Sequence, residues 1–252
     1  MDRDLPALLS RMERDLAELA ASGDARRFFH ATYLRTTRAV AEEIARGGFI
    51  DAAWLCRWDL AFAELYLDAL AADRAGTAVA APWRIAFDTA AQRPDLPPLR
   101  HVLLGMNAHI NYDLPQALLN VITPAEFSDP ETVARRAADH RHVDEVLLAQ
   151  VGAEDLELGT VTKLSLTDRV LRPFNRAATR RLIAEARAKV WANTAILDRA
   201  RRAGPDPYAA MLAQLEELCA TRLRELVAPG QVLLKLARRG FGVQLPGGDP
   251  LA

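Results

Sequence analysis

The segment LLGMNAHINYDLP, residues 103–115, combines an apolar helical pattern with four polar side chains. At helical spacing, one broad apolar stripe is formed by Leu99, Val102, Leu103, Met106, Ile110, Leu114 and Ala117. His109 and Asp113 lie four residues apart on one edge of this stripe, and Asn107 and Asn111 lie four apart on the other. The pattern predicts a central helix over residues 99–122 that is buried on several sides.

Buried polar side chains are unfavourable unless each one finds a partner, so this helix predicts either a functional pocket or a satisfied structural network. Gly105 is a poor helix former, and its presence indicates close approach of a neighbouring element. Pro115 has no N–H to bond the carbonyl of Asn111, which predicts a kink beside Asp113. In the pocket interpretation His109, Asp113, Asn107 and Asn111 are the candidate catalytic residues.

The rest of the chain has the composition of a helical globular protein. Of its 252 residues, 50% are hydrophobic and 26% charged, and alanine, leucine, arginine and glutamate, which favour helix, are frequent. We predict an all-α fold with little or no strand, built as one compact bundle of about nine helices over residues 1–240 and followed by a flexible tail, 241–252. The main helices are expected at 6–21, 25–46, 51–73, 82–92, 99–122, 130–150, 174–202 and from the Gly204–Pro207 break to 227.

Charge and targeting features narrow the function classes. The 32 basic and 33 acidic residues give a net charge of −1, which gives no reason to expect binding to nucleic acid or to an anionic membrane. No stretch approaches the roughly 18 apolar residues of a membrane helix, and the acidic start, Met1–Pro6, is unlike a signal peptide. Cys56 and Cys219 are typical of buried thiols in a reducing compartment. We expect a cytoplasmic protein, and its oligomeric state stays open.

A second histidine–aspartate pair, His140 and Asp144, repeats the spacing of His109 and Asp113. On helices, each pair can offer one nitrogen and one oxygen, so the four residues are candidate ligands of a divalent transition metal such as zinc. The alternative follows from the basic residues around His140. Such a stretch is usually solvated, and His140 and Asp144 are then a weak surface pair.

Other side chains are candidates for supporting the pocket. Asp59 lies within an apolar run and is either a buried acid or a partly exposed one. Arg187 and Trp191 are four residues apart, which predicts either a stacked pair or an arginine directed at a buried carboxylate. His101 stands alone among apolar neighbours, which is more typical of a core or rim residue than of a ligand.

The residues 103–115 resemble the signature of a bacterial family known as domain-of-unknown-function family 5995. Supporting segments are Asp51…Trp54…Trp58-Asp59…Phe62, Trp83-Arg84-x-Ala86-Phe87 and Arg187…Trp191-x-Asn-Thr, which extend the resemblance over most of residues 28–200. The resemblance implies a helical bacterial protein and carries no established activity.

The spacing of the two pairs is also similar to that of the zinc-dependent phospholipase C and P1-type nuclease group. Those helical phosphoesterases hold metals partly through two His-x-x-x-Asp/Glu pairs. Their mature chains begin with a metal-binding tryptophan and contain further histidines, which this chain lacks.

Two functions are therefore expected. The first is an enzyme acting on a small molecule, through acid–base chemistry at His109 and Asp113 or through metal-assisted hydrolysis. The second is a non-catalytic helical module in which the polar side chains bind a small ligand or only fix the packing.

Overall fold

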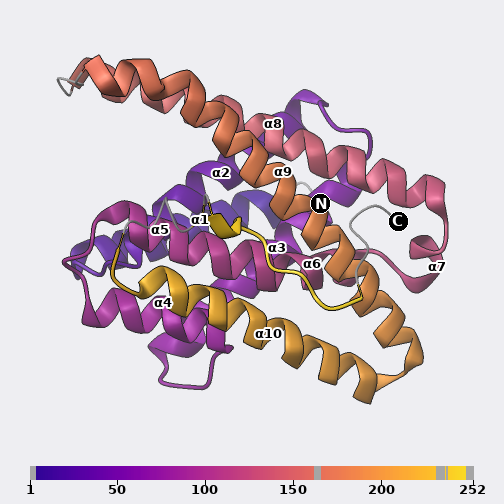
Figure 1. The fold of residues 1–252 in the computed structure, drawn as a ribbon. Coiled ribbons are helices and arrows are strands. Elements are labelled where there is room, and N and C mark those ends of the chain that lie inside the picture. Colours follow the sequence, from indigo (N-terminus) through magenta and orange to yellow (C-terminus); the bar gives the residue numbers. More distant parts are fainter. Residues whose placement is uncertain (1–3, 162–165, 231–235, 237, 248–252) are drawn as a thin grey trace.

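The computed structural model describes residues 4–161, 166–230, 236 and 238–247, with side chains given for all of these except 148–180, 182 and 183. The described residues form helices and contain no strand (Figure 1). The elements are α1 (Asp4–Ala21), α2 (Arg27–Arg46), α3 (Ala52–Arg74), α4 (Ala81–Gln92), α5 (Pro98–Ala108), the π-helical turn η1 (His109–Asp113), α6 (Leu114–Val121), α7 (Pro124–Phe127), α8 (Pro130–Val161), α9 (Leu166–Ala203) and α10 (Pro205–Val227). Because α5, η1 and α6 form one continuous rod, the described part of the chain holds nine helices, and the all-α prediction is confirmed.

Local sequence signals account for several helix boundaries. The Asp51 side chain accepts a hydrogen bond from the Trp54 N–H at 2.9 Å and so caps α3. Thr123 and Glu126 bond each other's backbone N–H groups in a capping box at the start of α7. Gly47 ends α2 with a φ of 75°, a left-handed conformation that glycine adopts without strain.

The long helices α8 and α9 differ from the sequence prediction. Helix α8 does not end before Gly152 but continues to Val161. A single glycine costs a helix only about 1 kcal/mol, so the neighbouring helix-forming residues outweigh it. Helix α9 begins at Leu166, well before Phe174, and therefore contains Pro173. In Figure 1 the paired ends of α8 and α9 project beyond the other helices.

The rod formed by α5, η1 and α6 lies at the centre of the bundle. Helix α5 packs on α2, α4 and α10, and α6 packs on α3 and α9. The predicted central helix is thus present and is covered on several sides. Among the described helices, none is long and apolar enough to cross a membrane.

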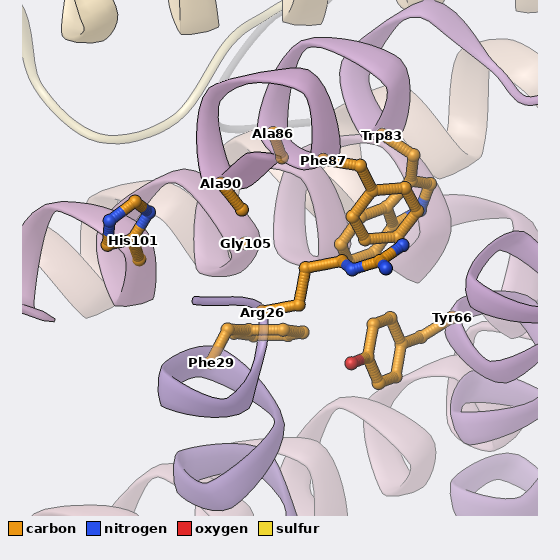
Figure 2. Close-up of a pocket in the computed structure, with 9 residues that line it drawn as sticks. All are labelled: Arg26, Phe29, Tyr66, Trp83, Ala86, Phe87, Ala90, His101 and Gly105. Carbon is orange, nitrogen blue, oxygen red and sulfur yellow. The ribbon is translucent and has the colours of Figure 1, made fainter. Parts of the chain in front are cut away.

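The close approach predicted at Gly105 is confirmed. A Cβ atom added to Gly105 on α5 would lie 2.3 Å from the ring of Phe29 on α2, so only glycine permits this spacing. Figure 2 shows Gly105 beside that ring. The glycine therefore sets the distance between α2 and α5.

The predicted apolar stripe is not the most buried face of the central rod. His109, Asp113, Asn107 and Asn111 are each 2% exposed or less. Residues of the stripe are only half-buried at Val102, Leu103, Met106 and Ile110, and Leu99 is 51% exposed. Over residues 99–110 the polar edges are thus more buried than the apolar stripe, whereas the stripe residues Leu114 and Ala117 on α6 are buried in the core.

The prediction of a flexible tail from residue 241 is wrong for residues 241–245. Phe241, Val243 and Leu245 are buried against the helices, at alternate positions of an extended segment. We call residues 240–245 the C-terminal strap.

Candidate functional site

Residues His109–Asp113 form a π-helical turn in the middle of the central rod. The Leu114 N–H bonds the carbonyl of His109, five residues back. Pro115 has no N–H to offer Asn111, so the helix gains one residue per turn here, where the sequence predicted a kink. Such turns are frequent at functional sites because they reorient the side chains that they carry.

Within this turn, His109 and Asp113 form a hydrogen-bonded pair, which we call the dyad. The Nδ1 atom of His109 lies 2.9 Å from Oδ2 of Asp113, and the indole N–H of Trp83 donates to the same oxygen at 2.9 Å. Burial lowers the pKa of His109 well below its usual value and raises that of Asp113 well above it. The hydrogen bond between Nδ1 and Oδ2 needs one proton, which either atom can carry. The other ring nitrogen, Nε2, is buried and has no hydrogen-bond partner among the described residues.

Five aromatic rings surround His109, and we call them the aromatic cage. They belong to Phe29, Tyr33, Phe62, Tyr66 and Trp83. The ring of Phe62 stacks on the imidazole with centroids 3.6 Å apart and planes 3° apart. The ring of Tyr33 meets it edge-on at 4.5 Å. The cage fixes the imidazole and removes water from it, which is the physical cause of its lowered pKa.

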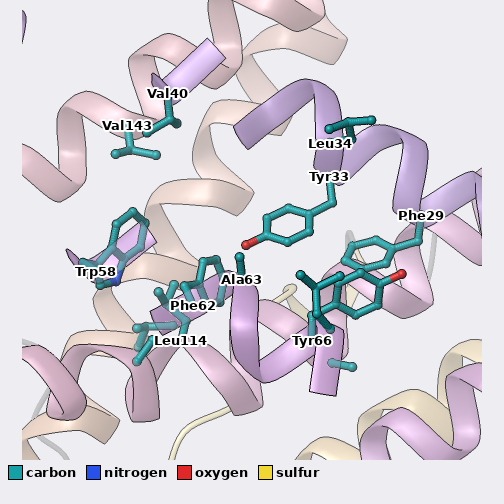
Figure 3. Close-up of a cluster of buried hydrophobic side chains, with 14 of the residues drawn as sticks. Phe29, Tyr33, Leu34, Val40, Trp58, Phe62, Ala63, Tyr66, Leu114 and Val143 are labelled. Atoms are coloured by element: carbon teal, nitrogen blue, oxygen red, sulfur yellow. The ribbon is translucent and has the colours of Figure 1, made fainter. Parts of the chain in front are cut away.

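Two further polar groups beside the cage lack partners. The Tyr33 hydroxyl and Oδ2 of Asp59 are buried and make no hydrogen bond to a described residue. Figure 3 shows the Tyr33 hydroxyl directed at α3 near Ala63. Asp59 is 3% exposed, and burial raises its pKa to about 7. Burial also raises the pKa of Tyr33, and the charges of Asp59 and Asp113 raise it further, so both carboxyl groups are within electrostatic reach of this hydroxyl.

The two asparagines of the central rod do not join the dyad. The side-chain N–H groups of Asn107 and Asn111 both donate to the carbonyl of Phe241, at 3.0 and 3.1 Å. The Val243 N–H donates to Oδ1 of Asn111 at 3.1 Å. The amides thus hold the backbone of the C-terminal strap as a neighbouring β-strand would. The bonds of Asn107 and Asn111 therefore go to the strap and not to the dyad, while Oδ1 of Asn107 is buried and has no partner among the described residues.

Residues of α9 complete the hold on the strap. Asn193 donates to the Val243 carbonyl at 3.0 Å and accepts from the Leu245 N–H at 2.8 Å. Glu185 accepts from two further N–H groups of the strap, and Lys189 donates to the carbonyl of Gly242. The strap therefore ties α9 to the central rod.

The second histidine–aspartate pair is separated in the structure. His140 is 1% exposed, and its Nδ1 accepts a hydrogen bond from the Trp191 indole at 3.1 Å. Asp144 forms a two-point ion pair with Arg187, as the carboxylate-directed interpretation of Arg187 predicted. The interpretation of His140 and Asp144 as a solvated surface pair is wrong. Burial and the charge of Arg187 lower the pKa of His140 well below its usual value, so this imidazole is neutral.

The four candidate metal ligands do not gather into one site. Between His109 and His140 stand the rings of Phe62 and Trp58, with successive centroid distances of 3.6, 5.5 and 5.0 Å along this row. In the part of the chain that the structure describes, no three His, Cys, Asp or Glu side chains are grouped to hold a metal ion. The arrangement of these donors gives no support to a zinc cluster shared by the two pairs.

A small cavity opens on the outer side of the cage. Its volume is about 20 Å³, and its lining consists of Arg26, Phe29, Tyr66, Trp83, Ala86, Phe87, Ala90, His101 and Gly105 (Figure 2). Phe29, Tyr66 and Trp83 belong to both the cavity and the cage. One layer of rings therefore separates the cavity from the dyad.

Sequence reasoning missed Tyr33 and the role of Trp83. Tyr33 is the residue one helical turn after Phe29 on α2, so helical spacing places both on one inward face. Trp83 was noted only as part of a resemblance. Its hydrogen bond to Asp113 joins residues 30 apart in sequence, and helical spacing does not predict a contact over that separation.

Comparison with known proteins gives one relationship. Among the curated proteins and the solved structures none matches the chain. A family model matches residues 5–229, which is most of the chain and includes the dyad, the cage and the cavity. The chain therefore belongs to the Family of unknown function (DUF5995).

Proposed function

We propose that this protein is an acid–base enzyme acting on a small molecule, with His109 as its proton-transferring residue. The observation that supports the proposal most directly is the unpartnered Nε2 atom of His109, whose opposite nitrogen is held by Asp113. Leaving a buried polar atom unbonded is unfavourable by about 1–3 kcal/mol, and a substrate atom would remove that penalty. A histidine oriented through Nδ1 by a carboxylate is the usual arrangement of a general base.

Hydrolysis is the simplest reaction for these groups. In the tautomer that carries its proton on Nδ1, directed at Asp113, Nε2 of His109 takes a proton from a water molecule while the water oxygen attacks the substrate. The same nitrogen returns the proton to the leaving group as the bond to that group breaks. Asp113 holds the ring in position throughout. Asp59, with a pKa of about 7, is a second group able to give or take a proton near neutral pH. Tyr33 offers a hydroxyl donor within electrostatic reach of both acids.

Substrate access requires movement of the aromatic cage, because His109 and Asp113 are each only 2% exposed. The cavity marks the thinnest part of the cover, where Trp83 alone both lines the cavity and bonds Asp113. Rotation of this indole would connect the cavity with the dyad.

The test compares the wild-type protein with His109→Gln and Asp113→Asn on chromogenic esters, amides, phosphoesters and glycosides. We expect turnover of one class, and a loss of about 100-fold or more in kcat on His109→Gln, the usual contribution of a general base. Circular dichroism and urea unfolding of each variant separate lost chemistry from lost folding. Turnover that survives His109→Gln unchanged would refute the role of His109.

A non-catalytic module is the alternative, and the closed cage is the observation that favours it. In that case the dyad serves only to fix the packing of α3, α5 and α6. Both substitutions would then lower the free energy of unfolding by several kcal/mol, because partners are left unpaired, while no substrate class is turned over by any form of the protein.

A further inference from the structure

The cavity beside Trp83 has the lining of a binding site for a flat molecule. Aromatic rings of Phe29, Tyr66, Trp83 and Phe87 form most of its walls. The remaining positions on α4 and α5 are small, at Ala86, Ala90 and Gly105, so the backbone lies close to the space. Aromatic walls with a few polar groups are typical of small-molecule sites.

His101 gives the cavity an unused polar group. It is 4% exposed, the backbone of Leu96 lies close to its ring, and neither ring nitrogen completes a hydrogen bond to a described residue. Its ring stacks on Phe28 at 5.8 Å, which fixes the orientation of both nitrogens. Burial lowers the pKa of His101, so the ring is neutral and offers one donor and one acceptor. A ligand with a matching acceptor and donor would satisfy both atoms.

The charges at the rim disfavour an anionic ligand. Arg26 is the one cation of the lining, and its guanidinium already pairs with Asp24 and Asp73. It also lies over the Phe87 ring, 5.7 Å from the centroid. Figure 2 shows its side chain extending across the cavity toward Trp83 and Tyr66. One positive and two negative groups leave no unbalanced positive charge for a carboxylate or phosphate.

The present volume of about 20 Å³ has room for about one water molecule. A six-membered ring therefore enters only when a lining side chain moves. Arg26 is the only long, flexible side chain among the nine lining residues. Its outward rotation would expose the faces of Phe87 and Trp83 while the rest of the lining stays in place.

We propose that this cavity binds an uncharged, planar aromatic or heterocyclic amide, which stacks between the rings and bonds His101 through its polar edge. This goes beyond the acid–base chemistry proposed above and stands whether or not the dyad is catalytic. Because Trp83 also donates to Asp113, occupation of the cavity alters the environment of the hydrogen bond at the dyad.

The experiment is a titration followed by the indole N–H signal of Trp83 in ¹H–¹⁵N NMR spectra, with the signal assigned by Trp83→Phe. Benzamide, benzoate and benzylamine serve as probes, because they share one ring and differ in charge. We expect benzamide to shift the signal with a dissociation constant on the order of 1 mM, the range of so small a ligand. Benzoate and benzylamine should bind several-fold more weakly.

Variants of the lining identify the site. His101→Phe keeps the stack on Phe28 but removes both nitrogens, and it should weaken benzamide binding about tenfold without lowering the melting temperature. His101→Gln keeps a donor and an acceptor and should retain part of the affinity. Ala90→Leu fills the cavity and should abolish the shift. His109→Gln should leave benzamide binding intact, which separates this site from the chemistry of the dyad.

The proposal is overturned if none of the three probes shifts the Trp83 signal. It is also overturned if benzamide binds His101→Phe as tightly as the wild type, or if benzoate binds as tightly as benzamide. Loss of benzamide binding in His109→Gln, with the fold intact, would place the ligand at the dyad instead.

Discussion

Replacing Asp59 by asparagine tests whether the buried acid within electrostatic reach of Tyr33 is uncharged. The pKa of Asp59 is about 7 in the folded protein against 3.8 for the free side chain, a difference of about three pH units. Each unit corresponds to 1.36 kcal/mol, so ionisation of Asp59 disfavours the folded state by about 4 kcal/mol. Asparagine has nearly the same shape and cannot ionise. The Asp59→Asn protein therefore does not lose this stability as the pH rises.

The pH dependence follows from the sign of the shift. Below about pH 4 both the folded and the unfolded protein hold the proton on Asp59, so the ionisation of this group does not lower the free energy of unfolding. Between about pH 4 and 7 the unfolded chain releases the proton while the folded protein keeps it, so stability falls as pH rises. The free-energy difference between Asp59→Asn and the wild type should therefore grow by about 4 kcal/mol from pH 4 to pH 8 and then level off.

Urea unfolding followed by circular dichroism at several pH values measures this difference. Other titrating groups, including the buried histidines, contribute to both proteins and largely cancel in the comparison. Asp68→Asn is the control, because the Asp68 side chain is 77% exposed, and it should show no such trend. A difference for Asp59→Asn that stays constant from pH 4 to pH 8 would refute the reasoning, since Asp59 would then be ionised in the folded protein.

Three further substitutions test the packing around the site, each by urea unfolding. Asn111→Leu should lower the free energy of unfolding by about 1–3 kcal/mol, because it leaves the buried Val243 N–H unpaired; an unchanged stability would mean that the strap is not bound. Gly105→Ala should cost about 1–3 kcal/mol through its clash with Phe29, and less in a Phe29→Leu background. Arg187→Met should lower the free energy of unfolding by about 3–5 kcal/mol, because it leaves the Asp144 carboxylate buried without its partner. The double change Arg187→Met/Asp144→Leu should lower it by less. A double change that loses the sum of the two single losses would contradict a buried ion pair.

Sequence predicts those parts of this fold that depend on neighbours along the chain. The cap at Asp51 and the capping box at Thr123 are local hydrogen bonds between residues three apart. The end of α8 was misplaced because Gly152 is a weak signal, which tertiary contacts and helix propensity readily outweigh. The boundaries at Asp51 and Gly47 were therefore predictable, and the one expected near Gly152 was not.

The burial of the polar side chains was predictable, but their partners were not. Asn107 and Asn111 bond Phe241, which lies 134 and 130 residues later in the chain. Nothing in the spacing of two asparagines distinguishes an amide that binds a strap from one that binds a substrate. The composition of the tail was equally misleading, because the glycines that suggest flexibility also allow an extended segment to lie flat against helices.

The basic residues around His140 led the sequence interpretation to a solvated surface. Arg136 shows why this inference fails. It is 7% exposed, its guanidinium lies 4.8 Å from the ring centroid of Trp54, and it pairs with Asp51. An arginine whose charge is paired and whose plane stacks on an indole can line the interior. Basic composition therefore does not predict the exposure of a histidine four residues away.

The two histidine–aspartate pairs have the same spacing, but only His109 and Asp113 bond each other. His140 and Asp144 instead bond residues of helix α9. On α8, His140 bonds Trp191 and Asp144 bonds Arg187, so two residues four apart meet two others four apart on an antiparallel helix. On α8, α9 thus bonds Nδ1 of His140 and the carboxylate of Asp144. At the π-helical turn, the donor that the described cage residues supply is the Trp83 indole, which bonds Asp113 and not His109. His109 is therefore left to bond Asp113 through one nitrogen and keeps the other unpaired. A metal-binding or catalytic role inferred from His-x-x-x-Asp spacing thus depends on what the facing helix presents, and the role that we propose for His109 rests on the ring nitrogen that no described side chain bonds.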